Sequence, residues 1–467
     1  MNFLTLGFAV FYIILIPLLA IQKKVKMRNV LLLTANLVFY SIGDLRSVPL
    51  LIAESAACYF AALKIRNEKA SGRTGKGYTA LMVLAAVAVL ILCKYLLFIG
   101  SALFGEGFAE RYRSLADIQP IGISFYTLMV ISYVVDVYRG RMEACEDFLS
   151  VALYVSFFPQ IMSGPITKAR ELMGQFGELH PITKAGVYSG MQIFLTGALK
   201  KVLIADRLAV CSNAVYSNPS MYSGLSIFLG TVCYTIQLYC DFSGYTDMAA
   251  GVATMMGFRL ARNFDLPYIA KNPTETWKRW HISLSSWLQE YVYISLGGNR
   301  KGKARQYLNL ILTMIVGGLW HGAAWTYILW GLQCGIGLCV HKTYVEYLKK
   351  PGKDTRVYTV MSTLATYLYF LAGTIIFRAE SAKDAFTIFE RIFTGAQGVG
   401  YYYVYFFIYF IFVAVAYAVA MIRNNGHGFY VNADMERFGY RVLFLFAVMM
   451  VVIYGYFGNN VFIYAQF

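Results

Sequence analysis

Apolar residues follow one another along most of the chain in long runs that short polar stretches separate. A helix that crosses a bilayer needs about 20 mainly apolar residues. Runs that approach this length cover residues 3–21, 29–43, 47–63, 78–100, 118–138, 147–163, 185–204, 222–240, 306–340, 357–377, 401–421 and 438–457. The run at 306–340 is one long helix or two shorter ones. The pattern therefore predicts an all-α membrane protein with about eleven to thirteen transmembrane helices.

Two parts of the chain depart from this pattern. The stretch "SGPITKAREL" (163–172) and the region 241–305 are neither good membrane spans nor good soluble domains. Non-helical or half-helical backbone is tolerated at membrane depth only where protein or a cavity surrounds it, and amphipathic helices lie in the interface. We therefore expect re-entrant or interfacial helices in both places.

Within the second region, large apolar side chains recur at steps of three and four, which places them on one face of a helix. The members of this face are Trp277, Trp280, Leu284, Trp287, Leu288, Tyr291 and Ile294. Pro273 and Thr274 predict the start of this helix, and "GGNRKG" (297–302) predicts its end. Because Trp and Tyr favour the headgroup level, we expect the 274–295 helix to lie along a membrane surface without crossing.

Composition agrees with a membrane protein, since 58% of the residues are hydrophobic and only 14% are charged. A soluble fold needs far more polar surface than this, so two or three soluble domains are excluded. No linker or repeat is apparent. We expect one membrane domain over residues 1–467, with N-terminal spans in 1–160, a core with the sequence motifs in 156–340 and C-terminal spans in 357–467.

The formal net charge of +16 comes from Lys and Arg residues in short clusters between the apolar runs. Such clusters orient a membrane protein, so we expect contact with membrane lipid and none with nucleic acid. The clusters at 23–28, 64–76 and 139–141 are each two spans apart, while the loops at 44–46 and 105–117 are poor in positive charge. This alternation predicts a multi-pass protein of the cell membrane, with the N-terminus outside and the basic loops in the cytoplasm. The first run lacks a basic leader and a cleavage site, so it is expected to remain as the first span.

His321, in "GGLWHGAAW" (317–325), is the only Asp, Glu, Lys, Arg or His residue between Tyr307 and Val340. A polar group in hydrocarbon costs several kcal/mol unless it is paired or used, which makes His321 a candidate site. Gly318 and Gly322 could form a small-residue packing face beside a hydrogen-bonded histidine, or they could leave room for a substrate chain. The sequence alone does not separate packing from a cavity.

His281 lies at the beginning of the predicted 274–295 helix, within one turn of Lys278 and Ser285. It is either a polar interfacial residue or a functional one. The remaining histidines, His180, His341 and His427, are assigned to solvent or interface. Eight cysteines lie mostly inside apolar runs and form no CxxC pair, so we expect neither a disulfide framework nor a metal site.

Four further ionisable residues lie in or near apolar runs. Asp241 and Asp247 are six residues apart, about 240° around a helix, and so do not form a carboxylate pair on one face. Asp241 is expected to be a helix cap, and Asp247 is expected to pair with Arg259 or Arg262. Lone charges at Asp136 and Lys94 predict partnered or snorkelling side chains.

Five motifs make the chain resemble the membrane-bound O-acyltransferase family, most closely its bacterial branch with alginate O-acetyltransferase and the teichoic-acid D-alanyl transfer protein. They are "SFFPQIMSGPI" (156–166), "QLYCDFSGYTDMAAG" (237–251), "NFDLPYIAKNPTETWKRWHISLSSWLQEYVYISLGGNRKG" (263–302), "GGLWHGAAWTYILWG" (317–331) and "FRAESAKDAF" (377–386). In "SLGGNRKG" (295–302) Ser295 stands where a proline is frequent, a departure that affects loop stiffness more than chemistry.

The resemblance implies a helical bundle around a buried tunnel, in which a cytoplasmic acyl donor meets an acceptor from the other side. It implies that His321 is the catalytic base and that His281 orients a reactant or stabilises charge. Side chains around them are expected to bind substrate. These candidates are Lys278, Arg279, Trp280, Ser285, Asn299 and Trp320.

The implied reaction is O-acetyl transfer from a thioester, acetyl-CoA or an acyl carrier protein, with no tightly bound cofactor and no metal. The implied acceptor is a hydroxyl of an extracytoplasmic polysaccharide, or of a partner protein that modifies one. D-alanyl transfer to teichoic acid from a carrier protein is the alternative within the family. A transporter also has intramembrane charges and broken helices, but no inverted repeat is apparent. A non-catalytic scaffold of an envelope complex is the third possibility.

Overall fold

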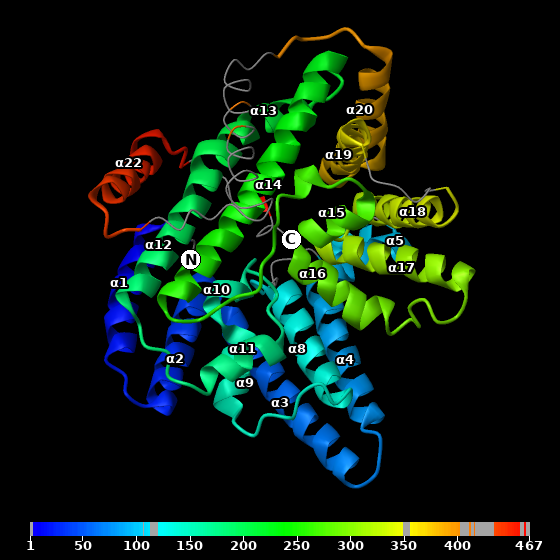
Figure 1. Ribbon diagram of the computed structural model, residues 1–467. Helices are drawn as coiled ribbons and strands as arrows, with labels where there is room; N and C mark the ends of the chain where they lie inside the picture. Colours follow the sequence, from blue (N-terminus) through cyan, green and yellow to red (C-terminus); the bar gives the residue numbers. More distant parts are fainter. Residues whose placement is uncertain are drawn as a thin grey trace.

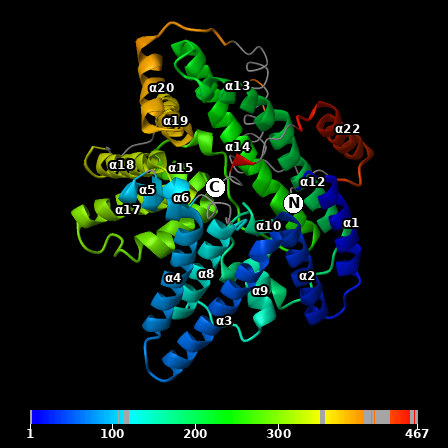
Figure 2. The same ribbon diagram turned by 180° about the vertical axis from the view of Figure 1, so that it is seen from behind.

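A computed structural model describes residues 3–105, 107–112, 120–348, 355–401, 411, 415, 434–457 and 462–463. Within these ranges the chain forms helices and no β-strand, as the apolar runs predict. Figure 1 shows the long helix α14 (Gly224–Met255) crossing the middle of the bundle, and the opposite view shows the same arrangement (Figure 2). The other helices surround it.

Most of the N-terminal part of the chain lies in the lower half of the view in Figure 1, below the middle of α14. Its helices are α1 (Leu6–Ala20), α2 (Val25–Asp44), η1 (Leu45–Ser47), α3 (Val48–Ala70), α4 (Lys76–Leu90), η2 (Ile91–Tyr95), α5 (Leu96–Phe104), α6 (Gly107–Arg111), α8 (Ile123–Tyr138), α9 (Phe148–Ser156), α10 (Phe158–Ile161) and α11 (Ala169–Phe176). The α1–α2 and α3–α4 turns lie at the same, lower end in Figure 1. The basic clusters in these turns are therefore at one end of the bundle, as predicted; which membrane face this end meets stays a prediction.

The middle part of the chain forms the centre. It comprises α12 (Lys184–Leu199), η3 (Lys200–Ala205), α13 (Asp206–Ser217) and α14. Glycines let α12 and α14 pack closely, because a Cβ atom on Gly197 would lie only 2.4 Å from the carbonyl oxygen of Gly244. The same holds for Gly251, where a Cβ atom would lie 2.6 Å from the carbonyl oxygen of Gly190.

The rest of the described chain comprises η4 (Pro267–Ile269), α15 (Pro273–Arg279), α16 (Ile282–Trp287), η5 (Leu288–Tyr293), α17 (Lys303–His321), α18 (Trp325–Tyr347), α19 (Arg356–Arg378), α20 (Ala382–Thr394) and α22 (Phe438–Tyr454), of which α22 lies against α12. In this part, α19 and α20 pack against α14, and α17 and α18 pack against each other. The 306–340 run is therefore two helices, α17 and α18. The predicted span at 401–421 lies almost entirely outside the described residues, and so does His427.

Four helical stretches of the described chain are long and apolar enough to cross a membrane. They are Val25–Ala70, Lys76–Phe104, Gly224–Met255 and Arg356–Arg378. Shorter apolar helices accompany them at Leu6–Ala20, Ile123–Tyr138, Phe148–Ile161 and Phe438–Tyr454. The all-helical membrane architecture is confirmed, and the number of spans stays a prediction.

Two acidic residues inside α14 have partners other than those predicted. Asp241 is not a cap but lies mid-helix, where Lys201 donates a hydrogen bond of 2.5 Å to its carboxylate. Asp247 pairs with Lys200 at 2.6 Å and not with either predicted arginine. The six-residue spacing turns the two carboxylates apart, and each meets one of two successive lysines of η3. Sequence distance favoured nearby arginines, whereas the close α12–α14 packing brings these lysines into reach.

Candidate active site

His321 is the last residue of α17, and its side chain is buried, with 2% of its surface exposed. Gly322 follows in an extended conformation and ends the helix. A Cβ atom on Gly322 would lie 2.2 Å from the ring of Tyr327, and one on Gly318 would lie 2.2 Å from the backbone oxygen of Tyr327. The glycines around His321 therefore let α17 and α18 approach, which favours packing over a substrate cavity at these positions.

Aromatic rings surround the imidazole of His321. Ring centroids lie 5.0 Å away for Trp320, 5.2 Å for Trp330 and 5.2 Å for Phe377, each with the two planes steeply inclined. These rings come from α17, α18 and α19. Burial of such large rings fixes side chains strongly, so the three helices together determine where the imidazole points.

His281 lies at a break in the predicted 274–295 helix. The chain forms α15, reverses at Trp280 and His281, and then continues as α16 and η5, so the continuous helix was a wrong prediction. His281 has a left-handed backbone conformation with φ of 44°, which is uncommon for a residue other than glycine. Such conformations persist where the surrounding structure fixes them, and they cluster at functional sites.

Asn263 stabilises the break between α15 and α16 through hydrogen bonds. Its backbone oxygen accepts a hydrogen bond of 2.9 Å from the amide of Ile282, and its side-chain oxygen accepts one of 2.5 Å from the hydroxyl of Ser283. The hydroxyl of Ser283 in turn accepts a hydrogen bond from the amide of Ile166, in the "SGPI" segment. Two of the sequence motifs, 156–166 and 263–302, therefore meet at the His281 turn.

The two motif histidines lie on the same indole. The ring centroid of Trp320 is 6.0 Å from that of His281 and 5.0 Å from that of His321. The indole itself is fixed, because its Nε1 donates a hydrogen bond of 2.9 Å to the backbone oxygen of Ser124. Residues that are 40 positions apart in sequence thus lie in one buried cluster of rings, and the roles that the resemblance implies for His281 and His321 stay predictions.

A cavity of about 1090 Å³ lies between α15, α16, η5, α17 and α18. Lys278, Ser285 and Asn299, three of the predicted binding residues, line it. So does His341, which shares a hydrogen bond of 2.8 Å with the hydroxyl of Thr274. His341 is therefore a candidate that the sequence did not single out, because its position at a span end beside Lys342 is typical of an interface residue.

The other predicted binding residues have different positions. Arg279 forms ion pairs with Glu275 and Asp265, which stabilise α15 and the preceding loop. Trp280 is buried among aromatic rings, including those of Phe264 and Phe370. Neither residue lines the cavity, so neither is placed to touch a ligand there.

The Trp-rich face of 274–295 is buried inside the protein. Only 2% of Trp280 and 5% of Trp287 is exposed, and the indole of Trp287 donates a hydrogen bond to the backbone oxygen of Leu128. The expectation that these rings mark the headgroup level was wrong, because the same apolar face serves equally well for packing on α8 and α14. Neither α15 nor the α16–η5 piece has the length of a span, as expected.

A charged cluster fixes the outer end of η5. The carboxylate of Glu290 accepts hydrogen bonds from Arg170 at 2.9 and 3.1 Å, from Arg141 at 2.9 Å and from Lys168. Arg170 also pairs with the buried carboxylate of Asp136 at 3.1 Å, so the prediction of a partner for Asp136 is confirmed. Burial acts to raise the pKa of Glu290, but the hydrogen bonds from Lys168 and Arg170 outweigh it and hold this pKa below its ordinary value.

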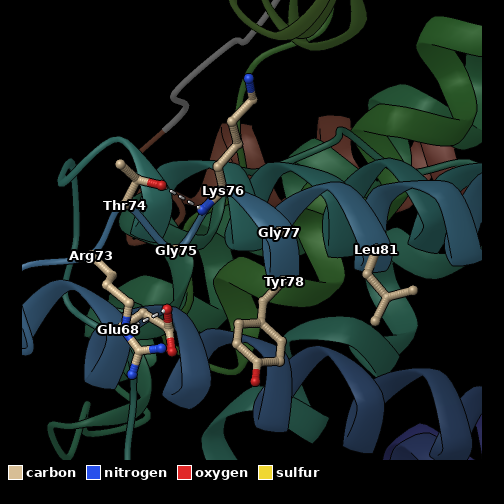
Figure 3. A pocket seen from close by; sticks show the side chains of 8 residues that line it. All are labelled: Glu68, Arg73, Thr74, Gly75, Lys76, Gly77, Tyr78 and Leu81. Carbon is tan, nitrogen blue, oxygen red and sulfur yellow. Dashed lines mark hydrogen bonds and ion pairs between the residues drawn. The ribbon is translucent and has the colours of Figure 1, made fainter.

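A second hollow, of about 500 Å³, lies at the α3–α4 turn (Figure 3). Two contacts join residues of its lining, because Arg73 pairs with Glu68 at 3.3 Å and the amide of Lys76 donates to the hydroxyl of Thr74. None of the residues that line it is a histidine. It provides a comparison for the cavity beside α17.

Comparisons with known proteins place the chain in a family. The model of the MBOAT, membrane-bound O-acyltransferase family, matches residues 145–383, which include both His281 and His321. The probable alginate O-acetylase AlgI of Pseudomonas aeruginosa is 38% identical over 377 residues, which cover 79% of this chain and 70% of that protein.

Two other relatives are named for different activities. A peptidoglycan O-acetyltransferase of Helicobacter pylori is 34% identical over 423 residues, covering 85% of this chain and 79% of that protein. A teichoic acid D-alanyltransferase of Bacillus subtilis is 27% identical over 275 residues, covering 56% of this chain and 69% of that protein. The chain therefore belongs to the membrane-bound O-acyltransferase family and is a membrane acyltransferase.

Proposed function

We propose that this acyltransferase moves an acetyl group from a thioester to a hydroxyl of an envelope polysaccharide, or of a partner protein that passes the group on. The observation that carries this proposal is the placement of His281 and His321 on one buried indole, on helices that also line the cavity of about 1090 Å³. The relatives with the highest identities given above carry the names of O-acetylating enzymes, which supports acetyl as the group.

In the proposed reaction, His321 acts as the general base. Its imidazole takes the proton of the acceptor hydroxyl while that oxygen attacks the thioester carbonyl. The carbon–sulfur bond then breaks, the thiolate leaves, and the imidazolium returns the proton to the sulfur, so that an ester and a free thiol are the products. Proton transfer of this kind typically contributes about 10² to 10⁴ in rate. His281, whose ring lies 6.0 Å from the same Trp320 indole, orients a reactant or stabilises the developing charge.

The cavity is proposed to hold the thioester donor. Lys278, Lys303 and Lys342 line it together with apolar residues such as Leu310 and Met314, a combination that suits a phosphate-bearing carrier with an apolar arm. Arg139 donates hydrogen bonds to the backbone oxygen of Glu290 and to Ser295, so this part of the molecule lies with the predicted cytoplasmic 139–141 loop. Acetyl-CoA and an acyl carrier protein both fit this description.

D-alanyl transfer to teichoic acid is the second candidate, supported by the relative from Bacillus subtilis. It would use the same histidines, with D-alanine in place of acetate on the thioester. The two functions differ in the ester that is formed. Mild alkaline release of acetate or of D-alanine from the envelope polysaccharides of producing cells therefore separates them.

The test is His321→Ala, with His180→Ala as the matched control, because His180 packs on Phe258 away from the cavity residues. We expect ester-linked acetate on envelope polysaccharide to fall to background with His321→Ala, while His180→Ala keeps the wild-type level. Protein level in the membrane fraction is measured in parallel. Wild-type acetylation by His321→Ala at normal protein level would refute the proposal.

A further inference from the structure

The helix that contains Lys94 contacts the end of α17. Between α4 and α5 the chain forms the π-helical turn η2, and Lys94 is one of the residues of this turn. It donates hydrogen bonds to the backbone oxygens of Trp320 at 2.8 Å and His321 at 3.4 Å, and to the hydroxyl of Ser124 at 3.1 Å. The expectation that Lys94 has partners is thus confirmed, and its partners belong to the candidate active site.

The neighbouring residue makes a parallel contact. The hydroxyl of Tyr95 donates a hydrogen bond to the backbone oxygen of Leu319. Lys94 and Tyr95 together therefore bind three successive carbonyls, those of Leu319, Trp320 and His321. Adjacent residues of an ordinary α-helix point about 100° apart. A π-helical turn changes this local winding, and such turns are frequent at functional sites.

These carbonyls belong to the last turn of α17, where backbone oxygens have no partner within the helix. The C-terminus of a helix also has partial negative charge, which favours a cation there. Among the described residues no carboxylate lies within 4.0 Å of the Lys94 ammonium, so the carbonyls and the Ser124 hydroxyl take the place of a counter-ion. The ammonium of Lys94 and the C-terminus of α17 therefore stabilise each other.

We propose that Lys94 is a positioning residue for acyl transfer. It holds the last turn of α17 so that the His321 imidazole keeps its place beside Trp320. Ser124 connects both parts of this arrangement, because its hydroxyl accepts from Lys94 and its backbone oxygen accepts from the Trp320 indole. The proposal rests on the function proposed above, in which His321 is the base. It adds a residue of the α4–α5 segment, which lies outside residues 145–383, where the family model matches.

Lys69 provides a matched control. Its ammonium lies 3.4 Å from the backbone oxygens of Val137 and Tyr138, at the C-terminal end of α8. The chemistry is the same, a lysine on the last carbonyls of a helix, but the end of α8 carries no histidine. A variant at Lys69 therefore shows how much such a contact contributes to stability when no histidine depends on it.

The experiment compares Lys94→Met, Lys94→Arg and Lys69→Met in membrane vesicles, with acetyl-CoA as donor and ester-linked acetate as readout. We expect Lys94→Met to lower kcat by about 10- to 100-fold, the size of effect that a misplaced catalytic group produces, with the KM for acetyl-CoA changed less than about twofold. Lys94→Arg should recover kcat to within about fivefold of wild type, because it retains the cation. Lys69→Met should keep wild-type kcat.

Wild-type kcat per folded Lys94→Met protein would overturn the inference, and so would a kcat of Lys94→Arg as low as that of Lys94→Met. If Lys94→Met does not fold, Tyr95→Phe tests the same idea, because it removes only the hydroxyl that binds Leu319. A several-fold lower kcat at unchanged KM supports the inference, and an unchanged kcat contradicts it. An active His321→Ala variant would instead refute the proposed function, which keeps the two failures distinct.

Discussion

Two buried polar regions of this membrane protein differ in what surrounds them. Between η3 and α14, Lys201 lies 2.5 Å from Asp241 and 2.8 Å from Asp206, and all three side chains are almost fully buried. Around His321, by contrast, the neighbours are the rings of Trp320, Trp330 and Phe377. In the first region, opposite charges compensate one another. In the second, aromatic rings pack around the imidazole of His321 and fix its position. A buried ionisable residue is therefore not by itself the sign of an active site.

The energetic consequence of this difference is large. Removal of one partner from a buried ion pair leaves an uncompensated charge, at a cost of about 3–5 kcal/mol. Removal of an imidazole leaves a smaller polar loss and no charge. We therefore expect variants of the first region to lose the folded protein and variants of the second to lose the reaction.

The largest effect on stability is expected for Lys201→Met. The substitution leaves the carboxylates of Asp206 and Asp241 buried without their shared cation, so the free energy of unfolding should fall by about 3–5 kcal/mol. Thermal unfolding in detergent and protein level in the membrane fraction measure this. Adding Asp206→Asn and Asp241→Asn should restore much of the protein. An unchanged unfolding temperature of Lys201→Met would show that the ion pairs do not stabilise the fold.

A smaller effect, on rate alone, is expected for His281→Ala. In the proposed mechanism His281 orients a reactant and His321 takes the proton, so kcat should fall by about 10- to 100-fold, less than for His321→Ala. The unfolding temperature should change little. Steady-state kinetics with acetyl-CoA in vesicles gives the values. A decrease in kcat as large as that of His321→Ala would contradict the proposed division of roles between the two histidines.

A still smaller effect is expected for Lys278, which lines the cavity beside α17. Lys278→Ala should raise the KM for acetyl-CoA by about fivefold to twelvefold at nearly constant kcat, because one charge-assisted contact to a phosphate contributes about 1–1.5 kcal/mol. Lys76→Ala, at the second hollow shown in Figure 3, is the control and should leave KM unchanged. Equal changes of KM in both variants would mean that the cavity beside α17 is not the donor site.

The smallest effect concerns pH and the charged cluster at Glu290. Its pKa is held below the ordinary value by Lys168 and Arg170 against the opposing effect of burial, so the carboxylate stabilises the fold at neutral pH. This contribution should persist above the unfolded pKa of about 4.3 and disappear as the pH falls through the lower folded pKa. The difference in unfolding temperature between wild type and Glu290→Gln, measured from pH 8 to pH 3.5, should be constant at first and then shrink. A difference that shrinks already between pH 8 and pH 6 would contradict this.

The sequence predicted the helical membrane class, and its motifs singled out His281 and His321, which are 40 residues apart and lie beside one indole in the structure. Lys278, Ser285 and Asn299, which it proposed as binding residues, line a common cavity, and their role in binding stays a prediction. These successes share a cause, because apolar periodicity and contiguous motifs are local properties of the chain.

What the sequence missed depends on distant contacts. The break at His281 is fixed by Asn263, 18 positions earlier, and no helical pattern in 274–295 reveals it. Trp280 and Trp287 pack inward, although the same residues on a lone helix would favour a membrane surface. Lys94 reads as a lone charge until the structure places it on the carbonyls of Trp320 and His321, 226 and 227 positions away.

The most direct measurement compares His321→Ala with Lys201→Met for acetyl transfer per unit of folded protein in one set of vesicles. We expect His321→Ala to be present at the wild-type level and to transfer acetate about 10² to 10⁴ times more slowly than wild type. Lys201→Met should be scarce, and the fraction that folds should work at a rate close to wild type. Acetyl transfer by folded His321→Ala at the wild-type rate would contradict the assignment of His321 as the catalytic base.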